Sequence, residues 1–387
     1  MMHHNWRLLD SRIAAAAFDR SISAFCIRVK ADSHSRKPLR IAQISPLWTR
    51  IPPATYGGVE LLMKLLIEEL VARGHDVTLF ATGDCTTSAK LRPICDVNLC
   101  ELLERGDGYM AEYYANAAMA DALRAAQEFD VIHCHMTPAW LPLASLSPTP
   151  LLWTLHTAMH RDDEWALRRY PETAVVGISH DQMHAHAIRL GRDFPVVYNG
   201  CDFSAFDPCF EPGEYLAFIG RMSPSKNPLD AIHIAKAAGM PIILAGQPQN
   251  ADEERYFTEK VKPLVDGKDV RWIGPVNHLQ KNELLRRAAA LLFPIQWDEP
   301  FGLVMIEAMA CGCPVIAHRR GSVAEVVDDG ATGFTSSVID GMAELVPSAT
   351  ALDRAAVCEH ARNRFGHHRM VDGYEDLYRQ LVTQRRE

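Results

Sequence analysis

The sequence has no long hydrophobic run, no excess of positive charge and no pair of C-x-x-C motifs. No apolar stretch approaches the ~20 residues that a membrane-spanning helix needs, which leaves only peripheral membrane contact open. The formal net charge of −8 argues against a nucleic-acid binder that depends on bulk positive charge. The ten cysteines form no disulfide or zinc pattern, so we interpret them as free thiols in a reducing cytosol and expect a cytoplasmic protein.

The first 38 residues lack the alternation of strands, turns and helices that the rest of the chain shows. They contain Arg, Ser and the run Ala14–Ala17, as a targeting segment would, but several acidic residues dilute that signal. We therefore interpret residues 1–38 as a disordered or non-native N-terminal extension, and we expect the fold to begin at Leu39.

From Leu39 onwards, short apolar runs alternate with segments of helical periodicity, as in α/β proteins with mainly parallel sheets. In the first half the pattern predicts helices at 59–73 and 108–128 and strands at 40–45, 76–81, 129–135, 151–157 and 174–179. Three of these strands end in His135, His156 and Ser179. Because ligands bind beyond the carboxyl ends of parallel strands, these three are candidate site residues, although a lone His is more often structural.

Pro208 and Pro212 punctuate an irregular segment, which we interpret as a linker at 203–213 between two domains. The second half repeats the rhythm, with predicted strands at 215–220, 241–246, 270–274, 291–294 and 314–317 and predicted helices at 229–238, 283–290 and 323–327. We therefore expect two Rossmann-like α/β domains, 39–202 and 214–365, that face each other across a ligand-binding cleft. The helical tail at 366–387 is expected to return to the first domain.

A glycine pair, Gly57 and Gly58, lies between the first predicted strand and the first predicted helix. This strand–glycine loop–helix unit is the usual anion-binding arrangement, although the dinucleotide fingerprint G-x-G-x-x-G is absent. Adjacent glycines let a phosphate or sugar approach the backbone closely. A plain tight loop explains the pair equally well on this evidence.

The segment from Asp298 to Pro314 begins as a turn and continues as a helix without a polar face, which is typical of a buried helix. Glu307 lies inside that helix, and a buried carboxylate is costly unless it is paired, so it should face hydrogen-bond donors. Glu299 lies just before the helix, where free N–H groups and the helix dipole favour anions. The alternative is a buried Glu satisfied by a neighbouring Arg or backbone amide, and a Glu307 matched to an internal base far from Arg221 and Lys226 would remove the basis of the functional interpretation.

With these residues laid out, the sequence resembles the retaining glycosyltransferases of family four, which have the GT-B architecture. The resemblance runs from about Leu39 to the C-terminus. It is carried by the segments 53–60 and 198–200, by Gly220-Arg221 with Lys226, and by E-x-F-G-x-x-x-x-E from Glu299 to Glu307. The last of these motifs is the most specific of the four.

The resemblance implies a role for each matching position. Glu307 would accept hydrogen bonds from a nucleotide's ribose, Glu299 would contact the transferred sugar, and Arg221 with Lys226 would hold the diphosphate. The implied donor-binding residues are Gly57, Gly58, Arg221, Lys226, Phe301, Gly302, Leu303, Val304 and Glu307. The implied catalytic residues are His156 and Glu299, and His135 and Ser179 are weaker candidates for the acceptor side.

The implied reaction moves a hexose from a nucleotide sugar, with a UDP-sugar such as UDP-glucose as the expected donor, to an unknown acceptor hydroxyl. No D-x-D motif occurs, so we expect no metal and no cofactor besides the nucleotide-sugar co-substrate. The 100–125 region and the loop from His160 to Tyr170 are where such enzymes usually contact acceptors. The residues noted for these regions match no pattern that identifies an acceptor: Met110, Tyr113, Tyr114, Trp140 and Trp165, with Arg161, Arg168 and Arg169. The oligomeric state cannot be read from the sequence.

Three other functions fit part of the pattern. A glycosidase could use Glu299 and Glu307 as its carboxylate pair, but it would leave Arg221 and Lys226 without a role. A nucleotide-sugar epimerase of the same architecture and a non-catalytic nucleotide-sugar-binding protein would use the same residues without glycosyl transfer.

Overall fold

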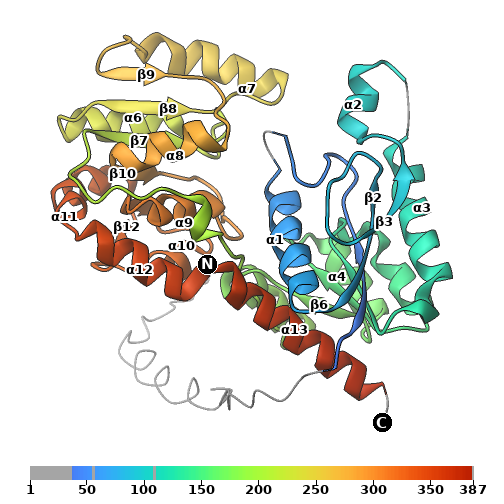
Figure 1. The fold of residues 1–387 in the computed structure, drawn as a ribbon. Helices are drawn as coiled ribbons and strands as arrows, with labels where there is room; N and C mark the ends of the chain where they lie inside the picture. The colour runs from blue at the N-terminus through green and yellow to red at the C-terminus, as the bar shows by residue number, and fades with distance from the viewer. Residues whose placement is uncertain (1–36, 55–56, 108–109, 386–387) are drawn as a thin grey trace, which may run out of the picture. The chain divides into compact units, whose positions relative to one another are not determined.

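The computed structural model describes residues 37–54, 57–107 and 110–385. Most of the extension expected at 1–38 therefore lies outside the described residues, as does Tyr56 beside the glycine pair. The described residues contain two six-stranded sheets, one in each half of the chain, and every strand pairs in parallel with its neighbours (Figure 1).

The first sheet has the strand order β3-β2-β1-β4-β5-β6. Its strands are β1 (Arg40–Ile44), β2 (Asp76–Thr82), β3 (Lys90–Cys95), β4 (Val131–Cys134), β5 (Leu151–Thr154) and β6 (Ala174–Val176). The order reverses direction between β1 and β4, which is the strand order of a Rossmann sheet.

The second sheet has the order β12-β11-β10-β7-β8-β9, which is the same topology repeated. Its strands are β7 (Tyr215–Ile219), β8 (Ile242–Ala245), β9 (Val270–Trp272), β10 (Ala288–Phe293), β11 (Val315–His318) and β12 (Gly333–Ser336). The expectation of two Rossmann-like α/β units is therefore confirmed. The exact boundaries at 202, 213 and 365 stay a prediction.

Helices connect the strands and cover the sheets (Figure 1). In the first half they are α1 (Gly58–Ala72), α2 (Leu99–Glu104), α3 (Ala111–Arg124), α4 (Arg161–Arg169) and α5 (His180–Leu190). In the second half they are α6 (Pro228–Ala237), α7 (Ala251–Tyr256), α8 (His278–Arg287), α9 (Leu303–Ala310), α10 (Val323–Val326), α11 (Val346–Thr350), α12 (Arg354–Phe365) and α13 (His367–Gln384). None of the described helices is long and apolar enough to cross a membrane.

The C-terminal helix α13 returns to the first sheet, as expected. Met370, Val371, Tyr374 and Tyr378 are buried in the same apolar cluster as Leu66 of α1 and neighbouring residues of the first sheet. Figure 1 shows α13 running beside α1. Because these side chains repeat at three- and four-residue intervals, they form one apolar stripe that the sheet and α1 cover.

The predicted helix at 283–290 is wrong in its second half. Helix α8 begins earlier, after a capping box formed by Asn277 and Gln280, and residues Ala288 to Ala290 belong to strand β10. Alanine favours helices, but this strand is fully buried at the centre of the second sheet, and such burial overrides a weak local propensity.

The sequence pattern does not predict two edge strands, β3 and β12. Strand β3 contains Pro93, which sheets tolerate at an edge because it lacks the N–H that an inner strand must donate. Strand β12 starts at Gly333, where a Cβ would lie 1.9 Å from the carbonyl oxygen of Val315. That glycine therefore marks a close approach between strands.

The packing of α13 can be tested by removing one buried side chain. Met370→Ala should lower the free energy of unfolding by ~2–5 kcal/mol, because it removes a buried side chain and leaves a cavity. Gln380→Ala, on the exposed side of the same helix, should change it by less than ~0.5 kcal/mol. Chemical denaturation followed by circular dichroism measures both values, and equal effects would contradict the docking of α13.

Candidate functional site

Strand pairing brings Lys226 and Glu299 together. Strand β7 pairs in parallel with β10, so the loops that follow them leave the same edge of the second sheet. The ammonium group of Lys226 forms an ion pair with Oε2 of Glu299, and the indole nitrogen of Trp297 donates to that oxygen at 2.9 Å. Both Lys226 and Glu299 are largely buried, so solvent screens this pair less than a surface pair.

The loop that carries Lys226 is fixed by hydrogen bonds to the loop after β10. Asn227 adopts a left-handed conformation with φ 62°, caps helix α6 and donates to the carbonyl of Pro294 at 3.0 Å. The carbonyl of Ser225 accepts from the backbone N–H of Gln296 at 2.8 Å. These contacts hold the Lys226 backbone in place without any ligand.

Arg221 starts the same loop but its guanidinium group meets a different carboxylate. It donates to Oε1 of Glu253, a buried residue of α7, at 2.9 Å. Glu253 also accepts from the backbone N–H of Gln249 at 2.8 Å. Arg221 and Lys226 therefore share a loop, and each has its own acidic partner.

The start of helix α9 lacks a side-chain cap. Its N-cap is Gly302, with φ 82°, and no side chain accepts a hydrogen bond from the first turn. The left-handed conformation at Gly302 favours glycine, and an added Cβ would lie 2.7 Å from the end of the Met305 side chain, which would have to move, and 3.3 Å from Phe293. The first-turn N–H groups, including those of Leu303 and Val304, leave a helix start suited to an anion. Phe301, just before it, is buried in the core.

Glu307 is matched to a base. This residue of α9 is 8% exposed, and its Oε1 lies 2.5 Å from the ammonium nitrogen of Lys281 on α8. The cost of a buried carboxylate is thus offset inside the protein, as the alternative interpretation of the sequence allowed. A nucleotide role for Glu307 therefore depends on the motif and no longer on an unpaired buried charge.

The glycine pair lies beside the start of α9. A Cβ on Gly57 would approach Pro53 to 2.7 Å and the Glu60 carboxylate to 2.9 Å, so the turn needs glycine for space. A Cβ on Gly58 would lie 3.3 Å from Cδ1 of Leu303. The N-terminal ends of α1 and α9, one from each half, are therefore neighbours.

His156 follows β5 and is bonded to a second histidine. Its Nε2 lies 2.9 Å from Nδ1 of His135, which follows the adjacent strand β4. Burial lowers the pKa of His156 to about 4, so the ring is neutral at pH 7. Its Nδ1 is buried and has no hydrogen-bond partner among the described residues.

His135 and Ser179 have local partners. His135 is buried, and its Nε2 lies 2.8 Å from Oε1 of Gln43. Ser179 is fully buried, and its hydroxyl caps helix α5 by accepting from the backbone N–H of Gln182 at 3.1 Å. The assignment of these two residues to an acceptor stays a prediction.

Several contacts of the site were not predicted from the sequence. The carboxylate of Glu325 on α10 accepts from the backbone N–H groups of His180 at 2.8 Å and Asp181 at 2.6 Å, and from the Tyr198 hydroxyl at 2.9 Å. It thereby joins the second half to the start of α5. The partners lie more than a hundred residues apart in the chain, and no local sequence signal links them.

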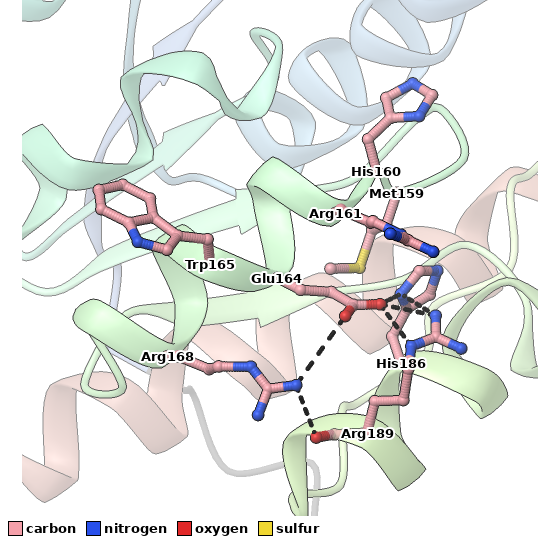
Figure 2. A pocket seen from close by; sticks show the side chains of 8 residues that line it. All are labelled: Met159, His160, Arg161, Glu164, Trp165, Arg168, His186 and Arg189. Atoms are coloured by element: carbon pink, nitrogen blue, oxygen red, sulfur yellow. Dashed lines mark hydrogen bonds and ion pairs between the residues drawn. The ribbon is translucent and has the colours of Figure 1, made fainter.

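A pocket of about 530 Å³ lies over α4 and α5 (Figure 2). Its lining residues are Met159, His160, Arg161, Glu164, Trp165, Arg168, His186 and Arg189. At its centre Glu164 accepts from Arg189 and from His186, each at 2.7 Å. Trp165 is 62% exposed at the rim. More positive than negative groups line the pocket, so it favours a negatively charged molecule.

A group of side chains that could bind a metal ion lies away from the loops of Lys226 and Glu299. Among residues 37–54, 57–107 and 110–385, one group of His, Cys, Asp or Glu could hold a metal ion, namely Glu69 of α1 with His367 and His368 of α13. Arg73 donates to the same Glu69 carboxylate at 2.8 Å and already supplies a positive charge there. None of these residues belongs to the loops of Lys226 or Glu299.

Two parallel sheets of identical topology, with a cation–carboxylate pair before an uncapped helix, define the class of GT-B glycosyltransferases. Family models agree: the model for glycosyltransferase family 4 matches residues 56–205, and the model for glycosyl transferases group 1 matches residues 206–346. The chain belongs to this family of glycosyltransferases.

Curated relatives cover most of the chain. A D-inositol 3-phosphate glycosyltransferase of Salinispora tropica is 26% identical, over 90% of this chain and 87% of its own length. A glycogen synthase of Mycobacterium tuberculosis is also 26% identical, over 84% of this chain and 89% of its own length. This chain is therefore similar to transferases that carry different names.

Solved structures share the fold. A glycosyltransferase involved in avilamycin A biosynthesis has a TM-score of 0.65 at 26% identity, covering 90% of this chain and 99% of its own. A sucrose-phosphate synthase from Thermosynechococcus elongatus has a TM-score of 0.69 at 22% identity, covering 90% and 100%. The second likeness shows the fold alone.

The helix start at Gly302 can be tested against a matched glycine. Gly302→Ala should lower the free energy of unfolding by more than the ~1–2 kcal/mol of left-handed strain, because the added carbon also displaces Met305. Gly330→Ala has nearly the same φ, 80°, but open space, so it should cost only the strain. Thermal unfolding of the two variants gives the difference, and a Gly302→Ala variant no less stable than Gly330→Ala would contradict the close packing.

Proposed function

We propose that this protein transfers a hexose from a nucleotide sugar to an acceptor hydroxyl, with retention of configuration and without a bound metal. The observation that carries the proposal is the Lys226–Glu299 ion pair beside the uncapped start of α9. A diphosphate needs positive charge and N–H donors, and a transferred sugar needs a hydrogen-bond acceptor. Lys226 and the N–H groups at the start of α9 supply the first, and Glu299 supplies the second, all within or beside the family's most specific motif.

The chemistry follows from where charge develops. As the bond between the sugar's anomeric carbon and the diphosphate oxygen breaks, negative charge grows on the leaving nucleoside diphosphate. Arg221, Lys226 and the N–H groups at the start of α9 would stabilise that charge. The acceptor hydroxyl attacks the same face of the sugar, forms the new carbon–oxygen bond and passes its proton to the departing phosphate oxygen.

For the donor we take a UDP-sugar, with UDP-glucose as the first to test, on the strength of the family resemblance alone. The co-substrate would be the sole small molecule required, because Arg221 and Lys226 supply the positive charge that a metal supplies elsewhere. Glu307 would contact the ribose only if it shares its carboxylate with Lys281, since one of its oxygens already binds that ammonium group. We keep a cytoplasmic location as part of this proposal.

For the acceptor we propose a negatively charged molecule that enters the pocket over α4 and α5. Arg161 and Arg168 bring charge there, and the exposed ring of Trp165 offers a surface on which a sugar ring can pack. The pocket begins shortly after His156 in the chain. The name of one relative, D-inositol 3-phosphate glycosyltransferase, points to a phosphorylated acceptor, whereas glycogen synthase acts on a neutral glucan.

The ion pairs give the glycosidase alternative no support. In a glycosidase the two carboxyl groups flank the scissile bond, whereas Glu299 and Glu307 are each bound to a different lysine, Lys226 and Lys281. The relatives named above are transferases or synthases, and none carries an epimerase name. A non-catalytic nucleotide-sugar-binding protein remains the alternative that the first experiment must address.

The proposal is tested by measuring release of nucleoside diphosphate from a panel of nucleotide sugars. Each donor is incubated with inositol 3-phosphate, with a neutral glucan and without acceptor. We expect the fastest release with one UDP-sugar and the anionic acceptor, and a product whose anomeric configuration matches the donor by NMR. Binding without release for every pair would contradict an enzyme, and an inverted product would contradict retention.

Glu299→Gln should lower kcat by roughly 10²–10³, the usual effect of removing one electrostatic group from a transition state. Donor affinity should hold or improve, because the substitution frees Lys226 for the diphosphate. Glu283→Gln on α8, an exposed carboxylate paired only with Arg286 and Arg287, is the matched control and should leave kcat unchanged. Equal rates for wild type and Glu299→Gln would remove Glu299 from the reaction.

Arg221→Ala should weaken binding of uridine diphosphate by roughly tenfold or more, the worth of one charge-assisted hydrogen bond. The control is Arg255→Ala on α7, an exposed cation near Glu253 that pairs with Asp252. Isothermal titration calorimetry measures both. Unchanged affinity for Arg221→Ala would exclude this residue from the diphosphate contact.

A further inference from the structure

A chain of buried polar groups runs from the C-terminal helix to His156. The Tyr378 hydroxyl of α13 lies 3.1 Å from Nε2 of Gln43, a residue of β1. Oε1 of Gln43 lies 2.8 Å from Nε2 of His135, and Nδ1 of His135 lies 2.9 Å from Nε2 of His156. Tyr378 and Gln43 are fully buried and His135 is 4% exposed, so water does not compete for these bonds.

A branch leaves this chain at Tyr378. The same hydroxyl lies 2.6 Å from Nδ1 of His133, whose Nε2 lies 2.7 Å from the Thr154 hydroxyl. Thr154 in turn donates to the Tyr374 hydroxyl at 3.1 Å. The direction of each hydrogen bond to a histidine in this network therefore depends on which atom of the pair carries the hydrogen.

The three histidines of this hydrogen-bond network, His133, His135 and His156, are neutral at pH 7. Burial lowers the pKa of His133 and of His135 well below the ordinary value, and it lowers the pKa of His156 to about 4. A neutral imidazole carries one N–H and one lone pair, so a donor at one nitrogen makes the other nitrogen an acceptor. The protonated nitrogen of one histidine thus determines that of the next.

The amide of Gln43 sets the direction of the chain. Its Oε1 can only accept, so His135 carries its hydrogen on Nε2, and Nδ1 of His135 accepts. His156 must then donate from Nε2, which leaves a lone pair on its Nδ1.

The branch agrees with this direction. Nε2 of Gln43 donates a hydrogen bond to the Tyr378 hydroxyl, and this hydroxyl donates a hydrogen bond to Nδ1 of His133. His133 then donates from Nε2 to Thr154, and Thr154 donates to Tyr374. One assignment of hydrogens satisfies all of these bonds.

The series of hydrogen bonds ends at an acceptor, Nδ1 of His156, that has no donor in the described part of the chain. Nδ1 of His156 is buried and has no hydrogen-bond partner among the described residues. Buried polar atoms are nearly always paired, and the few exceptions call for an explanation such as a missing ligand. A lone pair here matches a ligand group that donates, such as a sugar hydroxyl, and does not match a phosphate oxygen.

We propose that Gln43 and Tyr378 are positioning residues that hold His156 in the tautomer with hydrogen on Nε2, so that its Nδ1 accepts a hydrogen bond from a hydroxyl of the bound substrate. The identity of that substrate rests on the proposed function. The tautomer does not, because it follows from hydrogen bonds within the protein, among Tyr378, Gln43, His135 and His156.

Two variants interrupt the hydrogen bonds that lead to His156, and a third leaves them intact. Gln43→Leu removes the acceptor of the His135 hydrogen, and Tyr378→Phe removes the hydroxyl that orients the Gln43 amide. Tyr374→Phe is the matched control, because this tyrosine is also buried on α13 and hydrogen-bonded, but it lies at the far end of the branch. Circular dichroism and thermal unfolding establish that each variant folds.

The tautomer is read directly by NMR of the full-length protein with ¹⁵N-labelled histidine rings. The His156 signals are assigned by their loss in a His156→Gln variant. We expect hydrogen on Nε2 in the wild type and in Tyr374→Phe, and a mixture of tautomers in Gln43→Leu and Tyr378→Phe. Hydrogen on Nδ1 in the wild type would reverse every bond of the chain and overturn the proposal, as would an unchanged tautomer in both chain-breaking variants.

Nucleoside diphosphate release gives the second readout. We expect kcat/KM to fall by roughly tenfold in Gln43→Leu and Tyr378→Phe, the worth of one lost hydrogen bond, and to be unchanged in Tyr374→Phe. A general loss of packing would affect both tyrosine variants alike, and that result would overturn the positioning role. If the wild type releases no diphosphate, the proposed function fails while the NMR result still decides the tautomer.

Discussion

The parallel pairing of β7 with β10 is the constraint on which the candidate site depends. It makes two loops that are separated by about seventy residues leave one edge of the sheet together, so that Lys226 and Glu299 meet. Three neighbouring residues hold the groups at that meeting point. Trp297 orients the carboxylate, Asn227 anchors the lysine loop, and Gly302 turns the chain into a helix whose first N–H groups stay uncapped.

The charge balance of the candidate site has a consequence for the proposed function. Arg221, Lys226 and Lys281 each have a carboxylate partner, in Glu253, Glu299 and Glu307. Such pairing stabilises the protein, because an unpaired charge in a largely buried position is costly. Under the proposed function, a diphosphate would compete with these carboxylates for the cations, and its binding would release Glu299 for hydrogen bonding to a sugar.

The sequence predicts the parts of this structure that repeat locally. Buried β-favouring runs, the starts of α1 and α6 and the E-x-F-G-x-x-x-x-E motif could be predicted, because each depends on neighbours along the chain. Ala288 to Ala290 were assigned wrongly because burial in a central strand outweighs alanine's helix propensity. Lys281 under Glu307, Glu325 at the start of α5 and Tyr378 beside Gln43 could not be predicted, because the contacts are made by the folded chain between distant segments.

The last of these contacts gives the C-terminal helix two roles. Its apolar stripe covers the first sheet, which any amphipathic helix could do, but Tyr374 and Tyr378 also present hydroxyls to a buried polar network. Buried polar groups are costly when unpaired, and the hydrogen bonds of Tyr374 and Tyr378 therefore favour one arrangement of α13 against β1, β4 and β5. The end of that network is the free nitrogen of His156. The return of the chain to the first sheet therefore completes the core and, under our proposal, also fixes the hydrogen-bonding state of His156.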